Sequence, residues 1–155
     1  MSYTYSTKAT ENSAKAVGIA LPISRKQSTQ VCAAIRGLNI QKAMKLLEDA
    51  VAMKRPIPMK KYNRNTGHKA GMGPGSYAPT TCSHVLKILK NAEANAQFKG
   101  LSTGNLIITH ASAQKGPTVM HFGRQRTKAK RTHIELVVEE IKKQEEPVKV
   151  RGAKK

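Results

Sequence analysis

The chain has 155 residues, which suits one compact domain with extensions. Lysine and arginine number 28 against 9 acidic residues, so the formal net charge is +19, and this self-repulsion disfavours a compact state without a polyanionic partner such as nucleic acid. Aromatic residues make up only 4% of the chain and tryptophan is absent, which argues against a single-strand reader with stacking platforms and favours double-stranded or folded RNA.

Two short helices are predicted in the first third of the chain, after a weak strand. Residues 2–8 alternate weakly and favour a short edge strand. Ser24 is a candidate N-cap for a first helix that Gly37 ends, and apolar residues recur at helical spacing between them. Asn39 is a candidate N-cap for a second helix, which must end before Pro56.

A long basic loop is predicted over residues 56–79. It is rich in Gly, Pro and Asn, it contains no carboxylate, and it lacks an apolar face, so RNA is the favoured partner and a disordered linker is the alternative. Its glycine-rich part, residues 71–75, follows no predicted strand and therefore does not match a phosphate-binding loop. One cluster in the loop combines cations with a ring and an amide, which suits phosphate contacts plus one stacking or base-edge contact: Lys60, Lys61, Tyr62, Asn63 and Arg64.

The second half of the chain predicts a third helix over residues 81–98 and strands over 105–112 and 132–141. In the last strand, Ile134, Leu136 and Val138 lie on one side, and the acidic Glu135 lies on the other, which we expect to face away from RNA.

Residues 113–131, between these two strands, predict an extended β-hairpin that projects from the sheet and needs RNA along its length. Strand alternation would put four of its cations in a row, with Arg131 opposite: Arg124, Arg126, Lys128 and Lys130. A charge run is usually only solvated surface, but the absence of nearby carboxylates favours RNA contact.

Neither catalysis nor metal binding is indicated. The five histidines have no metal-ligand spacing, so no metal and no cofactor is expected. Cys32 and Cys82 are isolated, which argues against disulfides, and Cys82 is better explained as a core residue than as a nucleophile. The beginning of the chain has no apolar signal core and no apolar run reaches the ~20 residues of a membrane span, so a cytoplasmic protein without membrane contact is expected.

Several segments together resemble the L twenty-two family of large-subunit ribosomal proteins, in its archaeal and eukaryotic form. In chain order they are Leu21-Pro22-Ile23-Ser24-Arg25-Lys26, Ile35-Arg36-Gly37-Leu38, Lys54-Arg55-Pro56-Ile57-Pro58, Lys61-Tyr62-Asn63, Gly67-His68-Lys69, Gly73-Pro74-Gly75-Ser76-Tyr77, Lys115-Gly116-Pro117 and residues 131–140. The hairpin departs from the family's usual longer tip, since only Phe122-Gly123-Arg124 is retained.

The resemblance implies an α+β fold in which three helices pack on one face of a small antiparallel sheet, with a protruding β-hairpin and a long basic loop. It further implies that the hairpin helps to line the nascent-peptide exit tunnel while the globular part contacts ribosomal RNA and neighbouring large-subunit proteins. The loop over residues 54–77 resembles an insertion that bacterial relatives lack, which points to an archaeal source. We expect a single domain over residues 1–142 and a charged flexible tail over residues 143–155.

Charge context and resemblance together give the predicted site. The nascent peptide would meet the hairpin tip at Met120, His121, Phe122 and Gly123. Ribosomal RNA would meet Arg25, Lys26, Lys54, Arg55, Lys60, Lys61, Tyr62, Asn63, Arg64, His68, Lys69, Lys115, Arg124, Arg126, Lys128, Lys130 and Arg131. We expect no enzymatic activity and no small-molecule substrate, and the rivals are an architectural DNA or chromatin protein and an RNA-modifying enzyme.

Overall fold

The computed structural model describes residues 3–8, 10–124 and 126–141. Helices and antiparallel strands follow one another, which confirms the α+β class. The predicted tail over 143–155 lies outside the described residues. The elements, in chain order, are β1 (Ser13–Leu21), α1 (Arg25–Ile35), α2 (Ile40–Val51), β2 (Ile57–Pro58), β3 (His68–Lys69), β4 (Gly73–Ser76), α3 (Pro79–Phe98), the 3-10 turn η1 (Thr103–Asn105), β5 (Leu106–Lys115), β6 (Val119–Met120), β7 (Lys128–Ala129) and β8 (Thr132–Glu140).

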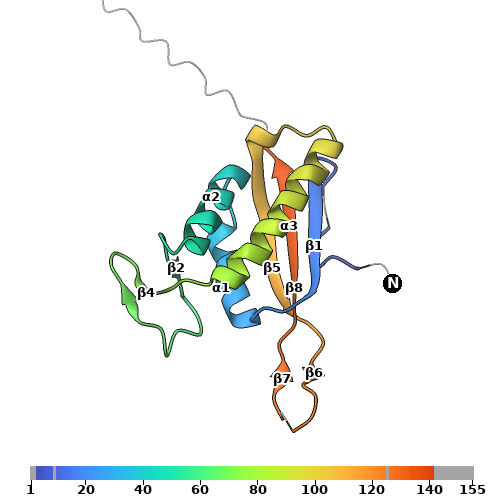
Figure 1. Cartoon of the computed structure of the whole chain (residues 1–155). Coiled ribbons are helices and arrows are strands. Elements are labelled where there is room, and N and C mark those ends of the chain that lie inside the picture. Colours follow the sequence, from blue (N-terminus) through green and yellow to red (C-terminus); the bar gives the residue numbers. More distant parts are fainter. Residues whose placement is uncertain (1–2, 9, 125, 142–155) are drawn as a thin grey trace, which may run out of the picture.

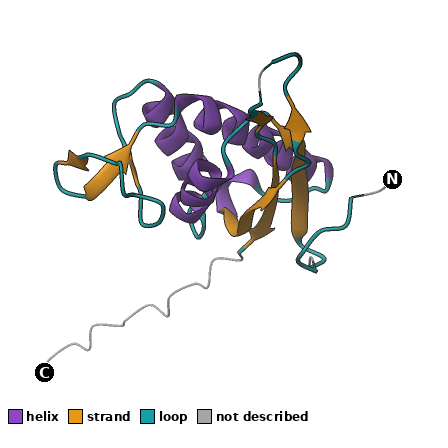
Figure 2. Ribbon diagram, turned by 90° about the horizontal axis from the view of Figure 1, so that it is seen from below, coloured by secondary structure: helices purple, strands orange, loops and turns teal. Residues whose placement is uncertain are grey.

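The centre of the fold is an antiparallel sheet in the order β1-β8-β5 (Figure 1). Its middle strand β8 carries Ile134, Leu136 and Val138, which are fully buried because α1 and α3 pack on that face. Helix α2 packs mainly against α3. The two views in Figures 1 and 2 show the helices between this sheet and a smaller one in the order β2-β4-β3.

Both predicted helix starts near the N-terminal third are confirmed. The Asn39 side chain accepts a hydrogen bond from the backbone N–H of Gln41 at 3.0 Å, as an N-cap should. Ser24 occupies the N-cap position of α1 but makes no side-chain cap hydrogen bond. Gly37 has a positive φ of 79° after α1, so the glycine supplies the left-handed conformation that ends this helix.

The predicted edge strand over residues 2–8 is wrong, since residues 3–8 contain no strand and the true edge strand is β1. The inner face of β1 carries only small residues, such as Ala14, Ala16 and Gly18, and so lacks the bulky alternation that signals a strand. Small residues are needed there because α3 lies close: a Cβ on Gly18 would come within 2.5 Å of the Ile88 Cδ1 atom.

The segment 56–79 is also more ordered than predicted, because three short strands form within it. Ile57 and Met59 are buried, and the Met59 N–H donates to the Pro74 carbonyl at 2.9 Å. The prediction failed because this small sheet buries its apolar residues against α1 instead of building a core of its own, so no period appears in the sequence.

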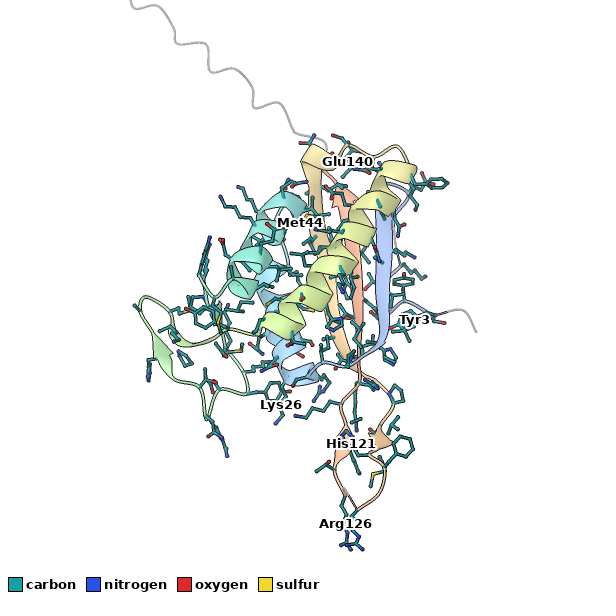
Figure 3. The ribbon with its side chains drawn as sticks, in the orientation of Figure 1. Tyr3, Lys26, Met44, His121, Arg126 and Glu140 are labelled. Carbon is teal, nitrogen blue, oxygen red and sulfur yellow. The ribbon has the colours of Figure 1, made fainter. Side chains whose placement is uncertain are left out.

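The hairpin beyond β5 is paired only briefly. Val119 pairs with Ala129 and Met120 pairs with Lys128, so the described residues 121–124, 126 and 127 belong to the end loop. The expected strand row of four cations is therefore wrong in its geometry: Arg124 and Arg126 lie in the loop, and Arg126 is at the far end in Figure 3.

The acidic outer face of β8 is covered by the N-terminal segment. Glu135 is fully buried there, and its carboxylate accepts hydrogen bonds from the Tyr3 hydroxyl, from the Ser6 hydroxyl and N–H, and from the Gln114 amide. Burial by itself raises the pKa of Glu135, but the hydrogen bonds from Ser6 and Tyr3 and the nearby His110 outweigh it, so the pKa is lowered. The ionised carboxylate therefore fastens the N-terminal segment to the sheet.

Replacing Glu135 by Gln should lower the free energy of unfolding by about 2 kcal/mol at pH 7, because charge-assisted hydrogen bonds are lost and an amide N–H₂ would face other donors. A pKa that is lower in the folded state gives stability that is present above the carboxylate's unfolded pKa and lost as pH falls through the folded pKa. Urea unfolding of both proteins at pH 7 and in acid checks this: the difference should shrink in acid, and a constant difference would contradict the assignment.

Candidate nucleic-acid interface

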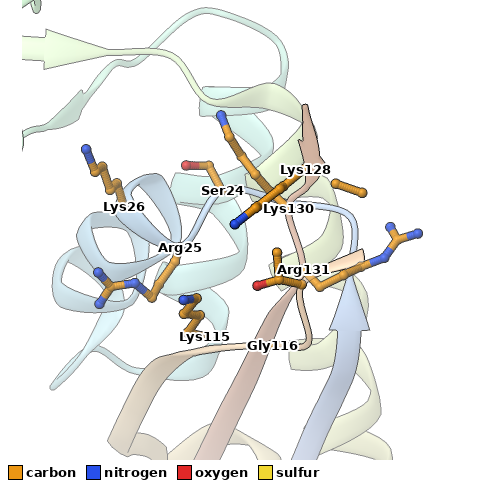
Figure 4. A pocket seen from close by; sticks show the side chains of 10 residues that line it. Ser24, Arg25, Lys26, Lys115, Gly116, Lys128, Lys130 and Arg131 are labelled. Carbon is orange, nitrogen blue, oxygen red and sulfur yellow. The ribbon is translucent and has the colours of Figure 1, made fainter. Parts of the chain in front are cut away.

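A pocket of about 440 Å³ lies between the start of α1 and the base of the hairpin (Figure 4). In the described part of the chain no carboxylate lines it, and six cations do: Arg25, Lys26, Lys115, Lys128, Lys130 and Arg131. In Figure 4 the side chains of Lys128 and Lys130 extend toward the start of α1, whereas the Arg131 guanidinium points away from it. Because the first turn of α1 also contains no acidic residue, its free N–H groups and helix dipole add to a site suited to phosphate.

The base of the hairpin depends on a close backbone approach at Gly116. The Gly116 N–H donates to the Arg131 carbonyl at 2.9 Å, and a Cβ on Gly116 would lie 2.9 Å from the Arg131 carbonyl carbon. Only glycine therefore lets the two arms meet at this point, and their meeting brings Lys115 to the same pocket as Lys128 and Lys130.

Replacing Gly116 by Ala should displace the hairpin base, because the new Cβ meets backbone that cannot move aside. We expect a loss of about 1–3 kcal/mol in the free energy of unfolding, as for overpacking. Gly104→Ala is the matched control, since a Cβ there has no neighbour within 4 Å. Urea unfolding of the two variants checks this, and equal stabilities would show that the hairpin base tolerates the side chain.

A second pocket, of about 540 Å³, continues the basic surface along the loop that precedes β3. Lys26 lines this pocket as well as the first, together with Tyr62, Asn63, Arg64, Asn65 and Thr66. The Lys26 ammonium lies 5.4 Å from the centre of the Tyr62 ring, and this ring is 51% exposed. The cluster predicted at residues 60–64 is thereby brought beside the start of α1 and the hairpin base.

The loop holds this position through Gln30 of α1. The Gln30 side-chain oxygen accepts from the N–H groups of Lys60 and Lys61 at 3.0 and 3.2 Å. Tyr62 follows with a positive φ of 60°, which is strained for a residue with a side chain. These contacts turn the charged and aromatic side chains outward as a group.

The other predicted cations lie apart from this surface. Lys54 and Arg55 follow α2, and their N–H groups donate to the Asp49 carbonyl. His68 and Lys69 form β3, where the Lys69 ammonium lies 5.3 Å from the Tyr77 ring centre. Arg124 and Arg126 lie in the hairpin's end loop, so six of the seventeen predicted contact residues lie away from this surface.

The residues of the predicted tip are all exposed to solvent. The side chains of Met120 and Phe122 are 54% and 97% exposed, and the adjoining His121 and Gly123 are also exposed. Figure 3 shows His121 on the arm, well away from the helices. Two cations, Arg124 and Arg126, follow these tip residues in the same connection between β6 and β7.

The electrostatics leave these cations uncompensated. Among the described residues, the one ion pair joins His110 Nε2 to Glu135 Oε2 at 3.6 Å. No described lysine or arginine therefore pairs with a described carboxylate within 4 Å, and an external polyanion is the available counter-charge.

Catalytic chemistry finds no support in the same residues. Burial raises the pKa of Cys32 to about 12 and that of Cys82 to about 11, so neither thiol ionises readily enough to act as a nucleophile. The described part of the chain contains no group of three or more His, Cys, Asp or Glu residues that could hold a metal. It also contains no helix with the length and apolar character needed to cross a membrane.

Sequence reasoning missed the residues that shape the site. Ser24, Gly116 and Thr118 line the first pocket, and Gln30 fixes the loop. Only Gly116 carried a usable signal, as an isolated glycine before Pro117 at the end of a strand.

Comparison with known proteins gives consistent matches over most of the chain. The family model of Ribosomal protein L22p/L17e matches residues 16–139. The chain is 42% identical to the "Large ribosomal subunit protein uL22" of Archaeoglobus fulgidus over 148 residues, covering 90% of this chain and 96% of that protein. It is 40% identical to the protein of that name from Methanocaldococcus jannaschii, covering 84% and 89%, and 38% identical to that from Staphylothermus marinus, covering 90% and 96%.

Proposed function

The chain belongs to the ribosomal protein L22p/L17e family, and from this we propose that it is a structural constituent of the large ribosomal subunit that clamps folded ribosomal RNA. The relatives are named as ribosomal subunit proteins and not as enzymes, which confirms the expectation that the chain is no enzyme. Its place is then the cytoplasm, within the ribosome.

The observation that carries the RNA contact is the continuous basic surface around α1. Two pockets lined by cations share Lys26, and neither pocket is lined by a carboxylate. Phosphates that occupy both would tie the hairpin base to the loop before β3, and each contact would release counterions. Neighbouring large-subunit proteins are expected partners beyond this surface.

Binding of the full chain to large-subunit ribosomal RNA and to duplex DNA, over a range of salt, tests the proposal. We expect steeply salt-dependent binding and a clear preference for the folded RNA. Equal affinity for the duplex DNA would favour the architectural DNA-binding alternative. Binding that does not depend on salt would contradict both the RNA-binding proposal and the DNA-binding alternative.

We further propose that the hairpin reaches the exit tunnel and meets the nascent peptide there. The support is its shape and its exposed apolar end, since Phe122 is almost fully exposed and Met120 is about half exposed. A contiguous exposed apolar patch commonly marks a contact with another molecule.

Excising residues 121–127 and joining Met120 to Lys128 by Asn-Gly tests the tunnel contact. Because those two residues pair directly, a two-residue turn can close the arm, and the removed described residues are all exposed. The free energy of unfolding should change by no more than about 0.5 kcal/mol, and subunit incorporation should survive.

What should change is the response to tunnel-binding macrolides or the stalling on arrest peptides. Wild-type behaviour in both assays, with normal incorporation, would show that the arm stops short of the constriction. The RNA-binding half of the proposal would stand in that case.

A further inference from the structure

A third pocket, of about 480 Å³, lies between α1, α2 and the small β2-β4-β3 sheet, apart from the two basic pockets. Two exposed cations, Arg55 and Lys60, line it, and none of its lining residues among those described is a carboxylate. Most of its lining is apolar: Ala33, Ala34, Leu38, Leu46, Pro56, Ile57, Pro58 and Met72.

One buried polar side chain in the lining has a free donor. Gln30 is 3% exposed, and its Oε1 atom accepts from the Lys60 and Lys61 N–H groups. Only the oxygen of an amide can accept, so these two bonds fix which way the side chain is turned. No hydrogen bond among the described residues uses the amide nitrogen of Gln30, which leaves two N–H donors for an occupant.

We propose that this pocket receives one unstacked nucleobase of ribosomal RNA. The proposal rests on the RNA-binding function proposed above. The faces of the base would pack against the proline rings and the Met72 and alanine side chains, and the Gln30 amide would donate to a carbonyl or ring nitrogen at the base edge. The flanking phosphates would meet Arg55 and Lys60. An apolar pocket with a few placed polar groups is the usual form of a site for a small planar group, and extruded bases are the usual elements that proteins read in RNA.

The chemistry of the lining favours a nucleotide over a segment of a neighbouring protein. Two cations, Arg55 and Lys60, line the pocket, and they match the phosphates that flank a base better than an uncharged peptide backbone. The pocket also adjoins the basic surface, since Lys60 lines it while the next residue, Lys61, lines a small cavity with Lys26 and Tyr62. One strand of RNA could thus pass from the phosphate contacts at α1 into the pocket.

Ala33→Leu fills the pocket from the exposed face of α1, and Ala94→Leu is the matched control on an exposed face of α3. Gln30→Glu is a second variant, because a carboxylate keeps both acceptor contacts to the loop but offers no donor. Complexes of each full chain with large-subunit ribosomal RNA are probed with dimethyl sulfate and carbodiimide, which report on exposed base edges. Thermal unfolding shows whether each variant folds. If Ala33→Leu does not fold, the base reactivities in the Gln30→Glu complex test the proposal.

We expect at least one base to be protected by the wild type and by Ala94→Leu but reactive with Ala33→Leu and Gln30→Glu, with about tenfold weaker binding for Ala33→Leu. Identical reactivities in all complexes would overturn the proposal. So would the detection, in assembled subunits, of a crosslink from this pocket to another ribosomal protein. If the wild-type chain itself binds without salt dependence, the RNA-binding function fails first, which is a separate result.

Discussion

Replacing Lys26, Lys115, Lys128 and Lys130 together by Gln is expected to weaken binding to large-subunit ribosomal RNA on the order of 10³-fold at ~0.1 M salt. All four side chains line the pocket at the hairpin base. If each contacts one phosphate, the slope of log affinity against log salt should also become shallower by about four units.

The control must remove the same charge elsewhere. Lys42, Lys45, Lys87 and Lys90 are exposed on α2 and α3, outside both basic pockets, and their replacement by Gln changes the net charge equally. Nitrocellulose filter binding over a salt series compares the two variants. Equal losses would mean that the chain attracts RNA through overall charge and that the hairpin base is not a site.

The second large effect concerns the centre of the sheet. Leu136 is fully buried on β8 and pairs with Ala16 on β1 and Ala111 on β5, whose small side chains cannot fill a vacated space. Leu136→Ala should therefore lower the free energy of unfolding by about 3–5 kcal/mol, a large part of a small domain's stability.

Ile19→Ala serves as its control, because Ile19 is 57% exposed on the neighbouring strand and should cost less than about 1 kcal/mol. Urea unfolding followed by circular dichroism measures both. Addition of ribosomal RNA should raise the stability of the Leu136→Ala variant, since a ligand that binds only the folded state favours it by mass action. An equal loss in the free energy of unfolding for the two variants would contradict the assignment of Leu136 to the core.

The sequence was informative where a local rule governs the structure. Asn39 and Gly37 marked helix boundaries because capping and left-handed turns depend on single residues. The face of β8 was readable because Ile134, Leu136 and Val138 are bulky and alternate. The cations were predicted as contacts because residues 50–92 and 94–134 contain no carboxylate, and their contact with RNA stays a prediction.

The predictions that failed concern features that depend on contacts between segments far apart in the chain. Strand β1 was missed because its inner residues, such as Ala16 and Gly18, are small and give no strand pattern. They are small because α3 packs close to them, which residues 13–21 alone do not indicate. The role of Gln30 depends on the fold, because the N–H groups that donate to its side-chain oxygen belong to Lys60 and Lys61, about thirty residues later in the chain. The alternation placed Glu135 opposite the apolar face but could not reveal its burial, because the covering residue Tyr3 lies 132 positions earlier in the chain.

The most direct test of the RNA-binding surface is a lysine footprint of the chain in isolated large ribosomal subunits. Lysines are acetylated in the free protein and in the subunit, and the extent at each position is measured by mass spectrometry. The proposed interface predicts strong protection at Lys26, Lys115, Lys128 and Lys130 in the subunit, and little change at Lys42 and Lys87. If the first group reacts as in the free protein while Lys42 and Lys87 become protected, the RNA lies on the helical face and the interface around α1 is refuted.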